Sequence, residues 1–511
     1  MAEEKKSRLY ILKPLIERWP AVSKPEGHVN FRTKIMWTLL CLVIYYILTN
    51  IMIFGMQQQF VDLFANYRFI MAGSSGSLMH LGIGPIVTAS IILQLFVGAK
   101  IIKLDLTKKE DKAIYQGSQK VLVIVMIFVE AIPQIFGYLR PSSQLIGMVG
   151  GEGMANFIII MQLVIGALLV FFMDELISKW GIGSGISLFI AAGVSEALFT
   201  GFFNWLPINS AAEISLSNPP AGVVPGTYYM ATHMTLEDMV GGGYQLMFVG
   251  RPGVYENAIV PLLGTILIFF IVVYAESSRI ELPLAHGKVR GARGRYPIRL
   301  IYASNIPVIL MAALLANINM FAMLLYQSNL PLLGRQWWIG TYDTTISTQP
   351  LAGGAWYLSG PNGVSYWLIP IMSGGDGSHD AIQYALKVII YLAIMIIGSI
   401  LFAKFWIETT DMGPSAVARQ IQSSDMQIPG FRRDPRILTK VLERYIPVVT
   451  VIGGAAVGAL AGFADLIGTV GRASGTGVLL TVGIMIQLYE QIAREQAMEM
   501  HPVLRGFFGA E

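Results

Sequence analysis

MANFIIIMQLVIGALLVFFM, residues 154–173, decides the class of fold, because it runs for 20 positions without one charged side chain. An α-helix rises about 1.5 Å per residue, so about 20 apolar residues cross the ~30 Å hydrocarbon layer of a membrane. The stretch therefore predicts a membrane-spanning α-helix.

The rest of the chain repeats this pattern. Hydrophobic residues make up 54% of the 511 positions and charged residues 13%, about half of the ~25% that is typical of soluble domains. We therefore predict an all-α membrane protein with ten transmembrane helices, and two sets of five helices would suggest an inverted repeat of the transporter kind. The predicted spans are 35–55, 83–99, 120–139, 154–173, 186–203, 258–275, 301–325, 385–405, 446–463 and 477–492.

Basic residues fall mainly on one side of this ten-helix path. Of the 36 Lys and Arg residues, all but six lie in the N-terminal segment, in the connections on its side of the membrane, or near the C-terminus. The six on the opposite side are Arg68, Arg140, Arg251, Arg335, Lys387 and Arg472. Because cytoplasmic loops carry the excess of Lys and Arg, we expect both termini to be cytoplasmic.

The spans and the charges together predict the organisation of the chain. We expect a cytoplasmic amphipathic segment (1–34), an N-terminal half with spans 1–5 (35–204), an external loop (205–257), a C-terminal half with spans 6–10 (258–500) and a cytoplasmic tail (501–511). The C-terminal half would carry basic cytoplasmic loops at 276–299 and 404–444, and an external loop at 326–384.

The connection between the first two spans is irregular. A half-apolar segment (60–71) leads into GSSGS (73–77), and the chain re-enters an apolar run at GIGP (82–85). An ordinary external loop fits this pattern, because loops of this length are common. A re-entrant element also fits, since irregular backbone is tolerated at membrane depth when it packs in protein or lines a cavity.

No catalytic or cofactor site is indicated. The zinc-protease, nucleophile-elbow and P-loop motifs do not occur, and the six His residues are scattered without ligand spacing, so we expect no enzyme activity, no cofactor and no metal. We expect the acids within the bilayer to be Glu130, in the third span, and Asp465, just past the ninth. A lone acid in a span marks either a polar contact between helices or an ion path.

Two loops are more basic than topology requires. LPLAHGKVRGARGRYP (282–297) is a Gly-rich, hairpin-like loop, and 404–444 is similarly rich in arginine. Such loops could serve only to fix topology. Because Arg presents a rigid fork of donors to phosphate, they could also bind a polyanion such as RNA.

Several ordered motifs resemble one known family. The chain is similar to the SecY family, the central subunits of the Sec protein translocase, in its archaeal and eukaryotic form. The resemblance extends from about residue 20 to about residue 499. The motifs are LGIGPIVTAS (81–90), YQGSQK (115–120), GIGSGIS (181–187), YPIRL (296–300) with SNIP (304–307), FWIETT (405–410), IPGFR (428–432) and GTGVLL (475–480).

The resemblance implies a pore. In this family, two pseudo-symmetric five-helix halves close around a central hourglass pore whose waist is a ring of apolar side chains. At the matching positions of this chain, the pore ring would be Ile83, Val87, Ile186, Ile190, Ile309 and Leu480. Without the resemblance, isoleucines four apart would indicate a helix face in the core or toward lipid.

The resemblance also implies a lateral gate, a plug and a docking face. The gate would lie between spans 2 and 3 and spans 7 and 8, with a polar contact across it from Thr88, Glu130 and Asn317. The plug would be about 57–76, a short helix that closes the pore at rest. The ribosome-docking residues would be Lys288, Arg290, Arg293, Arg295, Arg432 and Arg433.

The function and partners implied by the resemblance follow. We expect a channel in the plasma membrane of an archaeal cell, which moves unfolded secretory polypeptides across and releases transmembrane segments into lipid. The implied partners are a SecE/gamma-type subunit, a small beta-type subunit, the ribosome with its RNA and nascent polypeptide, membrane lipid and, indirectly, the signal-recognition particle receptor. The main alternative is a secondary transporter, which predicts paired charges at the middle of the membrane. A membrane scaffold would also fit the charges of the basic loops.

Overall fold

The structure is a computed structural model. The residues it describes are 8–27, 29–57, 71–102, 104, 106, 108–137, 139–209, 212–250, 256–286, 293–301, 303, 305–327, 336–342, 350–410, 412–423, 426–427, 435–471 and 473–500.

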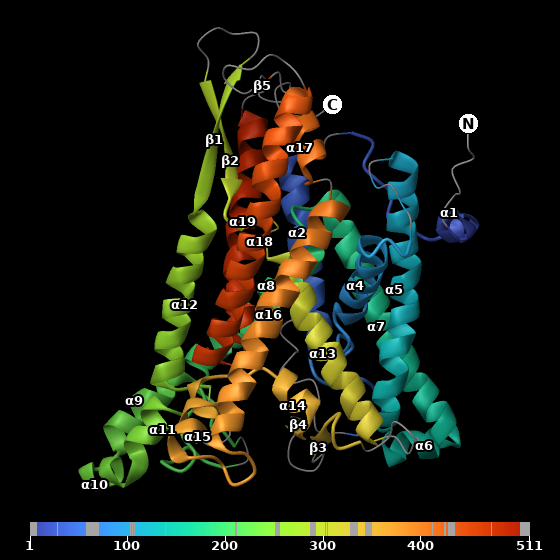
Figure 1. Cartoon of the computed structure of the whole chain (residues 1–511). Helices are drawn as coiled ribbons and strands as arrows, with labels where there is room; N and C mark the ends of the chain where they lie inside the picture. Colours follow the sequence, from blue (N-terminus) through green and yellow to red (C-terminus); the bar gives the residue numbers. More distant parts are fainter. Residues whose placement is uncertain are drawn as a thin grey trace.

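Two sets of five helices form the body of the molecule (Figure 1). The first set, which we call the N-terminal half, is α2 (Phe31–Asn50), α4 (Gly84–Gly98), α5 (Lys109–Gly137), α7 (Glu152–Trp180) and α8 (Gly185–Phe203). The second set, the C-terminal half, is α12 (Ile259–Ser277), α13 (Ile306–Gln327), α16 (Ala381–Thr409), α18 (Pro435–Ile467) and α19 (Gly475–Met500). Within each half, neighbouring helices pack along their length.

The predicted all-α membrane fold is confirmed. Among the described residues, nine helices are long and apolar enough to cross a membrane. The second predicted span, 83–99, forms α4, which has 15 residues and is therefore only about 22 Å long. Two helices begin well before their apolar runs, α5 at Lys109 and α18 at Pro435, because the helix continues through polar turns.

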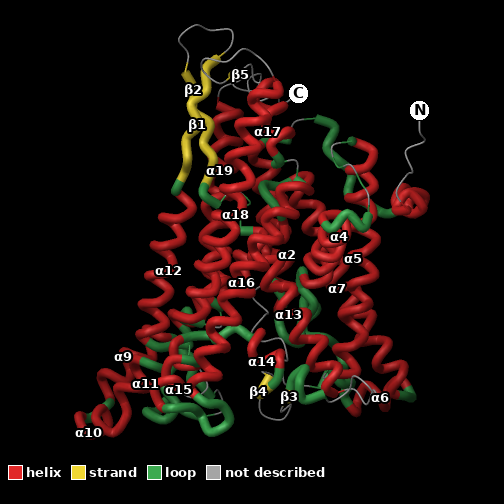
Figure 2. The backbone as a smooth tube through the Cα atoms, in the orientation of Figure 1, coloured by secondary structure: helices red, strands yellow, loops and turns green. Residues whose placement is uncertain are grey.

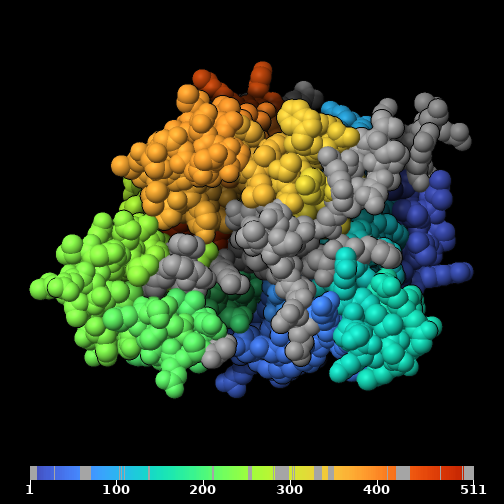
Figure 3. All heavy atoms as spheres, turned by 90° about the horizontal axis from the view of Figure 1, so that it is seen from below, coloured from blue at the N-terminus to red at the C-terminus, as the bar shows by residue number. Residues whose placement is uncertain are grey.

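The two halves meet along two seams. In the first seam, α4 packs against α13 and α16, and α5 packs against α13. In the second seam, α19 packs against α8 and α2. Seen from below, the blue-to-teal atoms of the N-terminal half and the green-to-orange atoms of the C-terminal half gather on different sides (Figure 3).

Close helix packing in the C-terminal half depends on a row of glycines. Gly454, Gly458 and Gly462 lie four residues apart on α18 and face α16. A Cβ at Gly458 would lie 2.6 Å from the Met395 carbonyl oxygen, closer than any side chain allows. Small residues at this spacing let two membrane helices bring their backbones together, where packing rather than hydrophobic transfer stabilises the pair.

Shorter elements surround this body. At one end lie α6 (Ser143–Val149), α9 (Val223–His233), α10 (Leu236–Asp238), η3 (Met239–Gly243), α11 (Tyr244–Phe248), β3 (Thr341–Tyr342), β4 (Pro350–Ala352), α14 (Gly354–Leu358), η4 (Val364–Tyr366) and α15 (Leu368–Ser373). At the other end lie η1 (Arg8–Leu12), α1 (Lys13–Arg18), β1 (Arg279–His286), β2 (Arg293–Arg299), α17 (Pro414–Ser423) and β5 (Met426–Gln427). The two long loops predicted as external thus contain helices and a two-stranded sheet.

The predicted hairpin is confirmed. Strands β1 and β2 pair antiparallel from Arg279↔Arg299 to Ala285↔Arg293 and project from the end of α12 (Figure 2). Strand β5 adds to β1 through Ala285↔Gln427, so the basic loops 276–299 and 404–444 contribute to one three-stranded sheet.

Candidate functional site

The six residues of the predicted pore ring come from α4, α8, α13 and α19 or the residue before α4. Ile83 directly precedes α4, and Val87 lies on α4. Ile186 and Ile190 are on α8, Ile309 is on α13, and Leu480 is on α19. Five are buried, with exposed fractions of 0 to 5%, Ile186 is partly buried, and all six join one hydrophobic cluster. That cluster also contains much of the helix core, so the role of these six residues as a ring stays a prediction.

The backbone before α4 is folded so that Ile83 lies in this cluster. The Ile83 N–H donates to the Met71 carbonyl at 2.7 Å. Between them, Gly82 has φ +54°, and a Cβ there would lie 2.0 Å from the same Met71 oxygen. Only glycine fits, because this position combines a left-handed conformation with contact against backbone.

The chain from 71 to 83 is packed inside the protein. Ser77, Met79 and His80 are fully buried, and the Tyr45 hydroxyl donates to the Ala72 carbonyl at 2.6 Å. An ordinary exposed loop is therefore the wrong interpretation for these residues, and the alternative of irregular backbone buried in protein is the one observed. The larger part of the predicted plug, 58–70, lies outside the described residues.

The predicted gate residues meet across the first seam. Thr88 of α4 donates its hydroxyl hydrogen to Glu130 Oε1 of α5 at 2.8 Å and shares it with the Gly84 carbonyl at 2.9 Å. Asn317 of α13 donates to the Thr88 oxygen at 3.0 Å. Thr88 is the centre of the contact, and the bond from Asn317 joins the two halves.

The predicted docking residues are only partly described. Arg293 and Arg295 lie on β2, opposite Ala285 and Pro283 of β1. Lys288, Arg290, Arg432 and Arg433 lie outside the described residues. The sheet that carries the two arginines lies at the same end of the molecule as the C-terminal end of α19 (Figure 1).

Comparison with family models assigns the chain. A model of the SecY family matches residues 77–489, and a model described as the plug domain of Sec61p matches residues 43–76. The chain belongs to the SecY family. The matched plug region includes the segment predicted as the plug and begins earlier, within α2.

Relatives that match along nearly the whole chain support the assignment to the SecY family. It is 44% identical over 507 residues to the protein translocase subunit SecY of Archaeoglobus fulgidus, covering 98% of each chain. It is 46% identical over 514 residues to the protein translocase subunit SecY of Haloferax volcanii, again covering 98% of each.

Solved structures share the fold. A structure described as that of a protein conducting channel matches with a TM-score of 0.74 and 38% identity, covering 96% of this chain and 98% of that one. Sec61 in the canine ribosome-channel complex from the endoplasmic reticulum matches with a TM-score of 0.72 and 37% identity, with the same coverage.

Sequence reasoning missed an ion-pair cluster near the C-terminal end of α7. Glu175 of α7 accepts from Lys179 at 2.7 Å, from Lys120 of α5 and from the Val22 backbone at 3.3 Å. It thereby ties the N-terminal segment to two helices. The sequence signal was local, since Glu175 and Lys179 are four apart on one helix face.

Acids within the spans were also predicted incompletely. Glu196 lies inside α8, on its exposed side, and was not predicted. Asp465 lies within α18 rather than beyond it, accepts from Tyr391 at 2.7 Å, and accepts from the Thr476 backbone at 2.8 Å. The second bond satisfies a free N–H at the start of α19, so Asp465 serves as a contact between helices.

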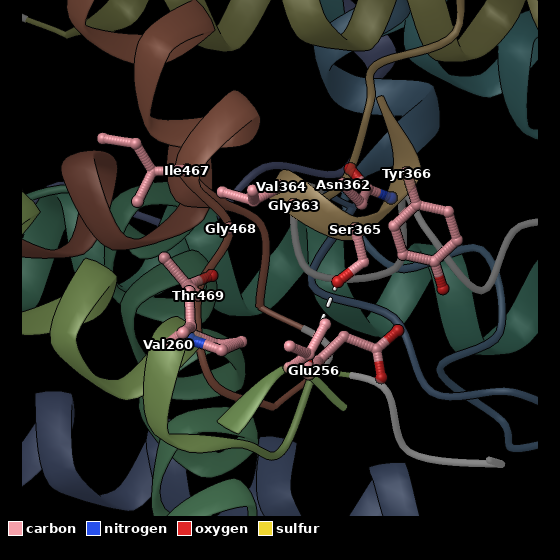
Figure 4. Close-up of a pocket in the computed structure, with 12 residues that line it drawn as sticks. Glu256, Val260, Asn362, Gly363, Val364, Ser365, Tyr366, Ile467, Gly468 and Thr469 are labelled. Atoms are coloured by element: carbon pink, nitrogen blue, oxygen red, sulfur yellow. Dashed lines mark hydrogen bonds between the residues drawn. The ribbon is translucent and has the colours of Figure 1, made fainter. Parts of the chain in front are cut away.

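A small pocket lies among the loops beside α11, η4 and the end of α18 (Figure 4). Its lining comes from the connection before α12, from η4 and from the residues at the end of α18, and it includes Glu256, Ser365 and Thr469. The cavity measures about 20 Å³, room for about one water molecule. A site of this size does not hold a transported solute.

Proposed function

We propose that this chain is the pore-forming subunit of a Sec protein-conducting channel. It moves unfolded secretory polypeptides across the membrane and releases transmembrane segments laterally into lipid. The observation that carries the proposal is the match of the SecY model to residues 77–489, which include every residue of the candidate pore ring and of the polar gate contact. The channel works by opening and closing, and we expect no catalytic step.

The apolar ring suits passage of many sequences. Ile83, Ile190 and Leu480 present only hydrocarbon, so a passing polypeptide meets neither fixed charge nor hydrogen-bonding groups at the waist. A narrow apolar constriction also resists ions, because water leaves it readily. The closed channel can thus stay sealed against ions, and the open channel does not bind one polypeptide sequence in preference to another.

The first seam suits lateral release. It is where α4 and α5 meet α13 and α16, and the described side-chain hydrogen bond across it is the one from Asn317 to Thr88. Parting these helices would open a path from the pore to lipid. An apolar signal sequence lying between the parted helices would then replace the apolar contacts between α4 or α5 and α13 or α16 with apolar contacts of its own.

The basic sheet suits docking to ribosomal RNA. Arg293 and Arg295 lie on a hairpin that projects from the membrane-spanning body, and a solved relative is Sec61 in a ribosome-channel complex. We infer that this end faces the cytoplasm of an archaeal cell, with both termini on the same side. The same reasoning by family supports a SecE/gamma-type subunit, a beta-type subunit and, indirectly, the signal-recognition particle receptor as partners.

Crosslinking of a stalled nascent chain tests the channel. Photoreactive probes at Ile83, Ile186, Ile309 and Leu480 should each crosslink a secretory chain held by a stalled ribosome, and only when that chain has a signal sequence. A probe at Phe270, which is 66% exposed on α12, is the matched apolar control and should stay unlinked. Ribosome binding without crosslinks at the four positions would contradict the proposal and favour a docking scaffold.

A further inference from the structure

Two arginines face each other at the base of the β1–β2 hairpin. Arg279 is the first residue of β1, Arg299 is the last residue of β2, and the two are partners in the register. Like charges directly opposite on neighbouring strands destabilise a sheet. This pair therefore needs a compensating group.

Glu490 of α19 is that group. Its Oε1 lies 3.4 Å from Arg279 Nη2, and its Oε2 accepts from Arg299 Nη2. One carboxylate thus holds both strands of the hairpin where they leave the membrane helices. In the described part of the chain, Glu490 is bound to no other basic residue.

A second contact seats the same segment on the same face of α19. Gly483 lies seven residues, about two turns, before Glu490. A Cβ at Gly483 would lie 1.7 Å from Asn305 Nδ2, so the side chain of Asn305, six residues after the end of β2, packs directly on the helix backbone. The Asn305 carbonyl accepts from the Val308 and Ile309 backbones and so begins α13.

The Arg279–Glu490 ion pair is partly exposed to solvent, which limits its contribution to stability. The side chains of Arg279 and Glu490 are 47% and 24% exposed, and ion pairs this open to solvent contribute little to overall stability. Their geometry nevertheless restricts the direction of the hairpin, because both strands are bound to one point on a long helix.

We propose that Glu490 is a positioning residue for ribosome docking. It fixes the angle of the hairpin on α19 and so aims the basic residues beyond the base, Arg293 and Arg295 among them, at ribosomal RNA. This inference rests on the docking role given under Proposed function.

The direction of one effect separates positioning from plain electrostatics. Removing an acid near a polyanion should strengthen binding, since phosphate contacts dominate affinity for RNA. Loss of positioning should weaken binding instead. Glu490→Gln is therefore expected to lower ribosome affinity about fivefold, as for the loss of a partly exposed ion pair.

The experiment uses the full chain in its native membrane complex, reconstituted in lipid. Ribosome affinity is measured for the unchanged protein, for Glu490→Gln and for Glu495→Gln. Glu495 is the matched control, because it lies on the same end of α19 and pairs with Lys34 rather than with the hairpin. Spin labels at Ala285 and at the exposed Ala493, in a Cys41→Ala background, report the hairpin angle as a distance distribution.

We expect Glu490→Gln to weaken binding and broaden the distance distribution, and Glu495→Gln to do neither. Exchange of the charges, Glu490→Lys with Arg299→Glu, should narrow the distribution again. Unchanged or tighter binding by Glu490→Gln would overturn the inference. If Lys288→Glu with Arg290→Glu leaves binding intact, the docking role itself fails, and the distance measurement still decides whether Glu490 holds the hairpin.

Discussion

At Thr88, one hydroxyl group joins three helices. It accepts from Asn317 of α13 and donates to Glu130 of α5, while its own helix is α4. A membrane interior offers these groups no water, so each bond replaces an unsatisfied polar atom rather than a hydrated one. Measured bonds of this kind nevertheless contribute only about 0.6 kcal/mol on average.

Thr88→Val should therefore loosen the gate without unfolding the protein. Valine keeps the shape and loses both bonds, which should shift the closed-to-open balance by about 1 kcal/mol, or about fivefold. Export of substrates with weakened signal sequences should rise accordingly. Ser90→Ala is the control, because Ser90 bonds to Gln119 within the N-terminal half. Equal export by both variants would rule out a gating role for Thr88.

Pairs of helices depend on shape more than on polarity. The row of glycines on α18 brings its backbone against α16, and a Cβ at Gly454 would meet the Ala403 methyl at 3.1 Å. In lipid, apolar side chains gain nothing by leaving solvent, so such close packing is what distinguishes the correct partner.

Gly458→Leu should separate α16 from α18. Overpacking of a well-filled contact costs about 2 kcal/mol, and here the Met395 carbonyl cannot move away without bending its helix. We expect a lower midpoint of thermal unfolding in detergent. Gly153→Leu on α7 provides the comparison, because a Cβ there meets nothing within 4 Å. A similar fall of the unfolding midpoint in both variants would mean that the effect does not come from the α16–α18 contact.

Across the whole molecule, the two seams are built differently. The second seam combines backbone contact, with Gly201 closely packed on Gly471, and a Lys34–Glu495 ion pair of 2.7 Å. The first seam combines apolar packing with the polar contact at Thr88. The halves should therefore pivot about the second seam and part at the first.

Docking of the whole complex should depend steeply on salt. Affinity for RNA falls with salt, and each lost arginine contact to phosphate makes the slope of log affinity against log salt less steep by about 1. The double variant Arg293→Gln with Arg295→Gln should therefore make it less steep by about 2. Arg140→Gln, on the side predicted to be external, should leave the slope unchanged. Ribosome binding measured over a salt series decides this, and equal slopes for all three proteins would exclude RNA contacts by β2.

The sequence by itself determined the membrane class and the approximate place of the spans, because apolar length is a property of short stretches. Its motifs also indicated Thr88, Glu130 and Asn317 as one contact. The tertiary structure alone decided which helices form each seam, why α18 needs its glycines, and that Glu490 holds Arg299 from 191 residues away. The physical reason is that packing and ion pairing depend on which distant residues the fold brings within a few ångströms, and no local pattern encodes that.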